Sequence, residues 1–110
     1  MFLLCGLFLS VDAQPTSKKA KLIAAQKTFE TAMTLIDQET AQSRRESADK
    51  FLAASRLFAE VGNRSKQAES LSWAGRAFDD LNEKKQALNY YGQALKMYRL
   101  LKNKENEISK

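Results

Sequence analysis

The chain has 110 residues, of which 44% are hydrophobic and 28% are charged, a composition typical of one folded soluble domain. One proline and four glycines provide too few turn residues for a domain of many short strands, so we expect an all-α fold. The net charge is +5 and histidine is absent, which removes the commonest general base and metal ligand.

The beginning of the chain differs from the rest because residues 2–11 are mostly apolar. This run is too short to span a bilayer as a helix, which takes about 20 residues. It fits the apolar region of a secretory signal, and the residues VDA before Gln14 resemble a cleavage site. We therefore expect residues 1–13 to be a signal peptide cleaved between Ala13 and Gln14. The protein would then be secreted or periplasmic, with no membrane contact after cleavage. No Lys or Arg follows Met1, so a cytoplasmic chain with an apolar N-terminus is the alternative.

The segment after the expected cleavage site leads into the first helix. Residues 14–21, with the sequence QPTSKKAK, are expected to form a linker. From Leu22 onward, apolar residues recur at spacings of three and four, which predicts an amphipathic helix. We expect this helix to end between Gln38 and Ala41.

The second helix has its own start and stop signals. Ser43 and Glu46 have the spacing of a capping box, in which the serine oxygen accepts from a free backbone N–H and the glutamate reaches back to the cap. Gly62 can adopt the left-handed conformation that closes helices. We therefore expect a helix between these signals, and a first hairpin over residues 22–62.

Two more helices are predicted in the second half of the chain. A third is expected over residues 65–81 and a fourth over residues 82–102, with Asn82 as the cap of the fourth. Because the connecting loops are short, neighbouring helices must be antiparallel. Residues 63–103 therefore form a second hairpin, and residues 104–110 are expected to begin a further helix or a tail.

The two hairpins match each other when the chain is shifted by 40 residues. Phe51 then coincides with Tyr91, and Phe58 coincides with Tyr98. The matched positions agree in size and polarity more often than in identity. A fixed period in this range predicts stacked helical hairpins.

The second hairpin also has a specific pattern of small and large side chains. These residues are Leu71, Ala74, Gly75, Phe78, Ala87, Tyr91 and Ala94. The pattern resembles the tetratricopeptide repeat, W-x2-L-G-x2-Y followed by A-x3-F, with Leu71 at the Trp position and Gly75 at the Gly position. Small Gly75 and Ala87 would let the two helices approach closely, and Phe78 and Tyr91 would fill the space beside them.

The resemblance implies an architecture and shows some departures from the family. It implies two antiparallel helical hairpins stacked as a fragment of a right-handed solenoid. The longer period is similar to the extended repeats of kinesin light chains and of bacterial repeat proteins that carry a CHAT domain. The family's proline after the second helix is absent, and the first hairpin, residues 22–62, matches the pattern only loosely. A generic helical bundle is the alternative.

The resemblance also implies a binding surface. In tetratricopeptide proteins, the first helix of each hairpin lines a groove that binds extended peptides or partner helices. The residues that would line it here are Glu69, Ser72, Arg76, Asp79 and Asp80. Trp73 would either pack under the neighbouring hairpin or anchor a partner. The implied function is a non-catalytic scaffold for protein–protein interaction with an unidentified protein or peptide.

A second apolar side is expected on the fourth helix. Tyr90, Met97 and Leu101 lie on a different side of this helix from Ala87 and Ala94. A solenoid would cover that side with another hairpin. We therefore expect a downstream repeat, a second copy of the chain or a partner to cover the last helix.

No other class of function has a clear signal in the sequence. Asp79 and Asp80 are adjacent, so on a helix they point about 100° apart and cannot share one catalytic site. We expect no catalytic residue, no metal and no cofactor. Basic residues are mixed with acidic ones, as in NEKK and KNKENE, which argues against a nucleic-acid partner. The alternative function is the N-terminal helical region of a larger enzyme, such as a CHAT-type protease.

Overall fold

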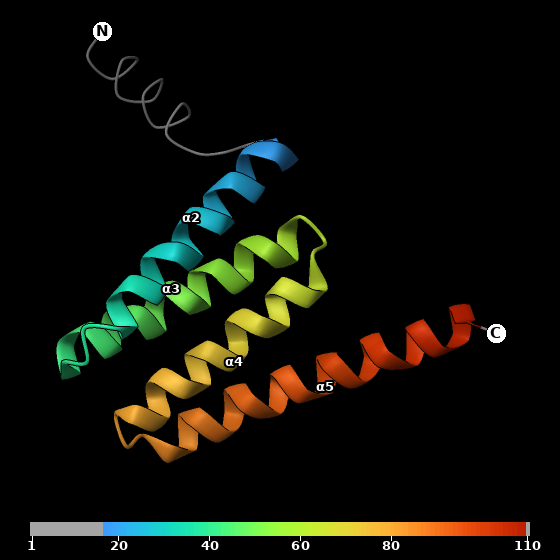
Figure 1. The fold of residues 1–110 in the computed structure, drawn as a ribbon. Coiled ribbons are helices and arrows are strands. Elements are labelled where there is room, and N and C mark those ends of the chain that lie inside the picture. The colour runs from blue at the N-terminus through green and yellow to red at the C-terminus, as the bar shows by residue number, and fades with distance from the viewer. Residues whose placement is uncertain (1–16, 110) are drawn as a thin grey trace, which may run out of the picture.

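In the computed structural model, which describes residues 17–109, the chain forms four α-helices. They are α2 (Lys18–Ile36), α3 (Ala41–Glu60), α4 (Arg64–Asp80) and α5 (Lys84–Ser109). Each helix packs against the next one along the chain, and the C-terminal part of α5 extends beyond the other helices (Figure 1). The expected four helices are confirmed for residues 17–109.

The first helix begins earlier than its apolar periodicity suggests. Ser17 caps α2, and its hydroxyl accepts a hydrogen bond from the backbone N–H of Ala20 at 3.0 Å. Residues from Lys18 onward, within the stretch expected to be a linker, are therefore helical. The predicted signal peptide and its cleavage site lie outside the described residues.

The start of α3 corrects the predicted capping box. Thr40, not Ser43, is the N-cap, and its hydroxyl accepts from the Ser43 N–H at 3.0 Å. The Ser43 hydroxyl in turn accepts from the Thr40 N–H at 3.1 Å. Ser43 thus takes the role that a Glu or Gln usually has in this motif. The helix accordingly begins at Ala41.

The turns after α3 and α4 have the same backbone geometry. Gly62 and Asn82 adopt the left-handed conformation, with φ of 78° and 62°. In the first turn the Asn63 N–H donates to the Phe58 carbonyl, and in the second the Glu83 N–H donates to the Phe78 carbonyl. Both distances are 2.9 Å. This is the Schellman pattern. Asn82 therefore closes α4, and the prediction that it caps the fourth helix is wrong.

The core lies on both sides of α3. Phe51 is fully buried at its centre. Its ring meets Phe29 of α2 edge-on at 5.4 Å and stacks on Trp73 of α4 at 5.9 Å. Alanines fill the close helix contacts, and those fully buried are Ala25, Ala32, Ala48, Ala54, Ala68, Ala74 and Ala77. The helix α3 is thus held between α2 and α4.

Alternate helices also share hydrophobic clusters. Trp73 of α4 joins a cluster to which Met33 of α2 contributes, and Tyr90 of α5 joins one to which Leu52 of α3 contributes. Lys66 of α4 places its ammonium 4.4 Å from the centre of the Phe29 ring. The helices α2 and α4 therefore approach each other on one side of the molecule, whereas Leu52 of α3 and Tyr90 of α5 line a groove on the other. None of the helices within residues 17–109 combines the length and the hydrophobicity that crossing a bilayer requires.

Candidate protein-binding surfaces

The residues expected to line a groove lie on one face of α4. Glu69, Ser72, Arg76, Asp79 and Asp80 follow each other at helical spacings, and each is exposed or half-buried. The neighbouring face of the same helix is buried through Leu71, Ala74 and Phe78. Packing of α4 between α3 and α5 therefore directs the polar residues outward.

The charges on this face pair with each other. Lys66 and Glu69 lie 3.2 Å apart, and Arg76 and Asp80 lie 3.8 Å apart. Asp79 accepts a hydrogen bond from Lys84 at the start of α5, and this bond raises the pKa of the Lys84 ammonium. Such exposed pairs contribute little to stability. Because both signs are present, the face does not select a partner by net charge.

A small depression lies at one end of this face, and residues outside the predicted set help to line it. Its volume is about 190 Å³, and its lining residues are Ile36, Asp37, Glu39, Arg44, Trp73, Arg76 and Asp80. Pockets for small molecules usually measure about 300–1,000 Å³, so this one suits a side chain of a partner. Asp37, Glu39 and Arg44 were not among the predicted residues, because only the turn between α2 and α3 brings them next to α4.

The small-residue pattern marks the closest approach of α4 and α5. A Cβ atom added to Gly75 would lie 2.9 Å from Cδ1 and 3.0 Å from Cε1 of Tyr91. Real Cβ atoms do not approach other atoms so closely, so the Tyr91 ring occupies space that only glycine leaves open. Partial burial raises the pKa of the Tyr91 hydroxyl, and the negative charge of Asp79 raises it further. The other pattern residues, Leu71, Ala74, Phe78, Ala87 and Ala94, are buried.

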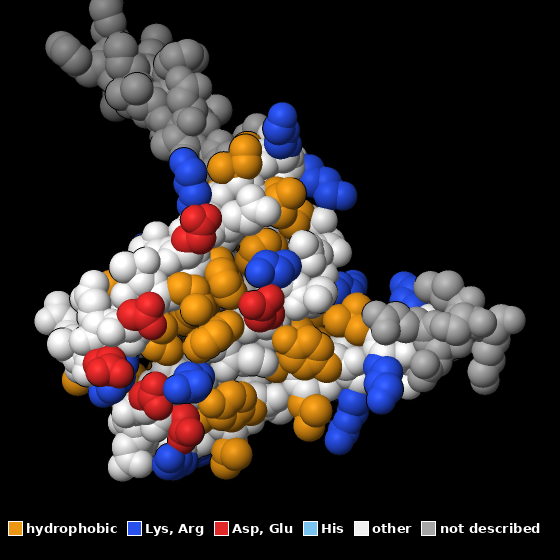
Figure 2. Space-filling view, viewed as in Figure 1, with side chains coloured by type: hydrophobic (Ala, Val, Ile, Leu, Met, Phe, Trp, Pro, Cys, Tyr) orange, Lys and Arg blue, Asp and Glu red, His pale blue; other side chains and the backbone are white. Residues whose placement is uncertain are grey.

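The outward face of α5 bears a row of exposed apolar side chains. Leu88, Tyr91, Leu95 and Tyr98 follow each other at spacings of three, four and three, and are 71%, 36%, 51% and 40% exposed. We call them the α5 row. Hydrophobic side chains gather along α5 in the space-filling view (Figure 2). The spacing was readable from the sequence, but the sequence alone does not show which side of α5 is covered.

The side of the fourth helix that was expected to be exposed is partly covered by α4. Tyr90 is half-buried, and its ring stacks on Phe78 of α4 at 5.6 Å. Met97 and Leu101 are also half-buried. The small residues Ala87 and Ala94 bring α5 close to α4, and this contact turns the side with Tyr90 inward.

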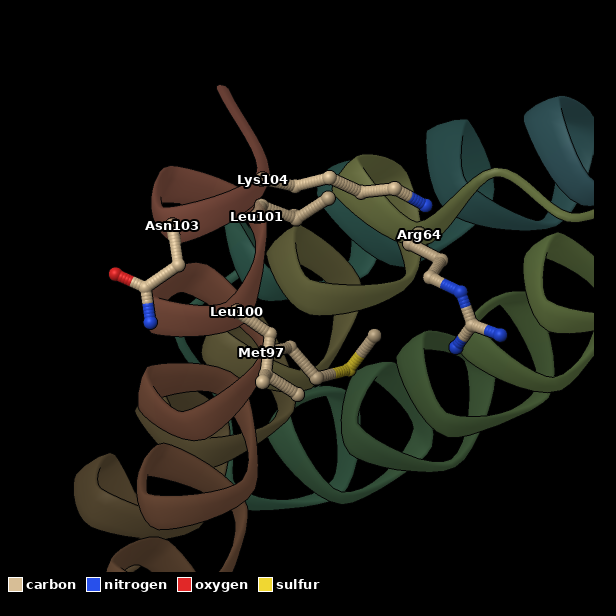
Figure 3. A pocket seen from close by; sticks show the side chains of 6 residues that line it. All are labelled: Arg64, Met97, Leu100, Leu101, Asn103 and Lys104. Atoms are coloured by element: carbon tan, nitrogen blue, oxygen red, sulfur yellow. The ribbon is translucent and has the colours of Figure 1, made fainter. Parts of the chain in front are cut away.

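A shallow pocket lies where α5 diverges from the beginning of α4. It measures about 590 Å³, and its lining residues are Arg64, Met97, Leu100, Leu101, Asn103 and Lys104. Lys104 extends from α5 toward Arg64 of α4, whereas Asn103 points away (Figure 3). The pocket thus has an apolar floor and a basic rim.

In comparisons with known proteins, the chain matches no protein-family model, no curated protein and no solved structure. Among the side chains that the structure describes, no group of three or more His, Cys, Asp or Glu is placed to hold a metal ion.

Proposed function

We propose that the chain is a non-catalytic scaffold for protein–protein interaction, built as a tetratricopeptide-like stack of two hairpins in a right-handed solenoid. The observation that carries this proposal is the position of α4. Its inner side packs against α3 and α5, while its polar side, from Glu69 to Asp80, remains accessible beside α2. An exposed first helix of a hairpin is the element with which such scaffolds bind peptides or partner helices.

The contact between Gly75 and Tyr91 supports the same proposal. The tetratricopeptide pattern places a small residue where the two helices of a hairpin cross closely. Here the Tyr91 ring lies against the bare backbone of Gly75. The mixed charges and the side-chain-sized depression at Trp73 and Arg76 suit a peptide segment better than a small molecule.

The proposal predicts that partner binding depends on the polar face of α4. We expect the full chain to capture a protein partner from its native source, and the charge reversals Glu69→Arg and Arg76→Glu together to weaken that binding about tenfold or more. A tenfold loss corresponds to about 1.4 kcal/mol. The measurement is quantitative affinity capture followed by titration of the captured partner.

Lys50→Glu serves as the matched control because Lys50 is an exposed charge on α3, away from this face. We expect it to bind like the wild type, with equal melting temperatures for all variants. Equal binding by the Glu69→Arg, Arg76→Glu variant would contradict the role of this face.

A further inference from the structure

The α5 row has a buried counterpart on α3. Forty residues earlier in the chain, the same spacings fall on Ala48, Phe51, Ser55 and Phe58, which we call the α3 row. These four residues are 0%, 0%, 6% and 0% exposed. The same helix positions are thus covered in the first hairpin and open in the second.

An antiparallel helix helps to cover the α3 row. Trp73 of α4 stacks on Phe51 at 5.9 Å, and Ala77 lies in one cluster with Ala48. At the other end, the Lys66 ammonium lies 5.9 Å from the centre of the Phe58 ring. Earlier residues of α4 thus contact later residues of α3, as expected for the antiparallel helices in Figure 1. A row with this spacing is therefore shaped for the side of an α-helix.

The charge of α5 restricts which helix can bind there. Residues 84–104 contain six basic residues and no Asp or Glu. On the helix, Lys85, Lys96 and Arg99 lie beside the α5 row at one edge. Arg45, the counterpart of Lys85, pairs with Glu83 just after α4. By the same geometry, Lys85 is placed to meet an acidic residue at the C-terminal end of a bound helix.

A second copy of the chain does not supply that helix. Two α5 helices would bring Lys85, Lys96 and Arg99 of both copies to one interface, and like charges facing each other are unfavourable. The first helix of a second copy is also basic, because residues 18–36 contain four lysines and one glutamate. The charges instead complement an acidic helix.

We propose that the α5 row binds an acidic amphipathic α-helix of another protein, antiparallel to α5 and placed as α4 is placed on α3. The apolar side of this helix packs on Leu88, Tyr91, Leu95 and Tyr98. Its acidic flank faces Lys85, Lys96 and Arg99. This surface is separate from the polar face of α4, so the proposal goes beyond the scaffold function and can fail or hold independently of it.

A peptide derived from α4 provides a defined probe. The acidic peptide has the sequence of residues 64–83 with Arg64, Lys66 and Arg76 replaced by Glu. The matched basic peptide keeps these three residues and carries Lys in place of its four acidic residues. Each is labelled and titrated with the full chain, and binding is followed by fluorescence anisotropy.

We expect saturable binding of the acidic peptide, at least about tenfold weaker binding of the basic peptide, and loss of affinity as salt screens the exposed charges. Leu88→Glu with Leu95→Glu should reduce the affinity for the acidic peptide at least about tenfold. Both side chains are more than half exposed, so this variant should fold, which circular dichroism can verify. Leu100→Glu is the matched control, because Leu100 is 62% exposed but lies outside the row, and it should bind like the wild type.

Several results would overturn the proposal. They are equal affinity for the two peptides, no binding of the acidic peptide, or unchanged binding by the Leu88→Glu, Leu95→Glu variant. Sedimentation with vesicles of phosphatidylserine and phosphatidylcholine tests a lipid surface as the alternative. Vesicle binding that requires Leu88 and Leu95, without peptide binding, would assign the row to membranes instead.

Discussion

Phe51→Ala is expected to lower the free energy of unfolding by about 3–5 kcal/mol, the usual cost of removing a buried phenylalanine. The Phe51 side chain is fully buried and contacts aromatic rings on both neighbouring helices, Phe29 of α2 and Trp73 of α4. Truncation would leave a cavity between three helices at once. Urea unfolding followed by circular dichroism measures the effect.

Tyr91→Ala is the matched control, because Tyr91 occupies the corresponding position on α5, forty residues later. Its ring packs on Gly75 but is 36% exposed, so truncation should cost clearly less than at Phe51. Equal losses of stability for the two variants would contradict the view that only the α3 row is covered.

Gly75→Leu is expected to destabilise the fold by about 1–3 kcal/mol, as overpacking of a close contact does. Even the first added carbon would lie 2.9 Å from the Tyr91 ring. Gly75→Ala should stay within about 1 kcal/mol of the wild type, because the gain in helix propensity offsets part of the crowding. The measurement is again the free energy of unfolding.

A double-mutant cycle with Tyr91→Ala identifies the cause of this effect. Without the Tyr91 ring, Gly75→Ala should stabilise the chain by up to about 1 kcal/mol, and Gly75→Leu should cost less than it does in the wild type. If the cost of Gly75→Leu were the same with and without the Tyr91 ring, the contact between α4 and α5 would not explain the need for glycine.

Helical periodicity was sufficient to predict the number and order of the helices within residues 17–109. The rotation of the last helix about its axis was not predictable in the same way. Its sequence has two apolar sides, one with Tyr90 and Met97 and one with Leu88 and Leu95. Both have helical spacing, so local propensity cannot choose between them. The contacts of Ala87 and Ala94 with α4 decide which side is buried.

The residues at which helices begin and end were also only partly predictable from the sequence. Ser43 and Asn82 both belong to residue types that favour N-caps, yet neither is the N-cap of a helix. Thr40 lies three residues before Ser43 and takes the cap, while the left-handed conformation of Asn82 completes the turn after α4. Residues suited to capping lie close together at these helix ends, so residue type alone does not select among them.

The candidate surface on α4 was only partly predictable. Spacing along the helix places Glu69, Ser72 and Arg76 on one face whatever the tertiary structure. The depression beside Trp73 needs Asp37 and Glu39 from the α2–α3 turn. Their proximity to α4 depends on how α2 and α4 meet across α3, which no local pattern specifies.

Extension of the chain by one hairpin tests the central claim that the hairpins are stacking units. Residues 104–110 are replaced by a second copy of residues 64–103, and Lys102→Gly supplies the left-handed residue that Gly62 provides after α3. Lys102→Gly alone is the control.

If each hairpin stacks on the next, the added copy of α4 covers the α5 row, and the extended chain melts in one transition above the wild-type temperature. A separate second transition, or an unchanged melting temperature, would contradict stacking.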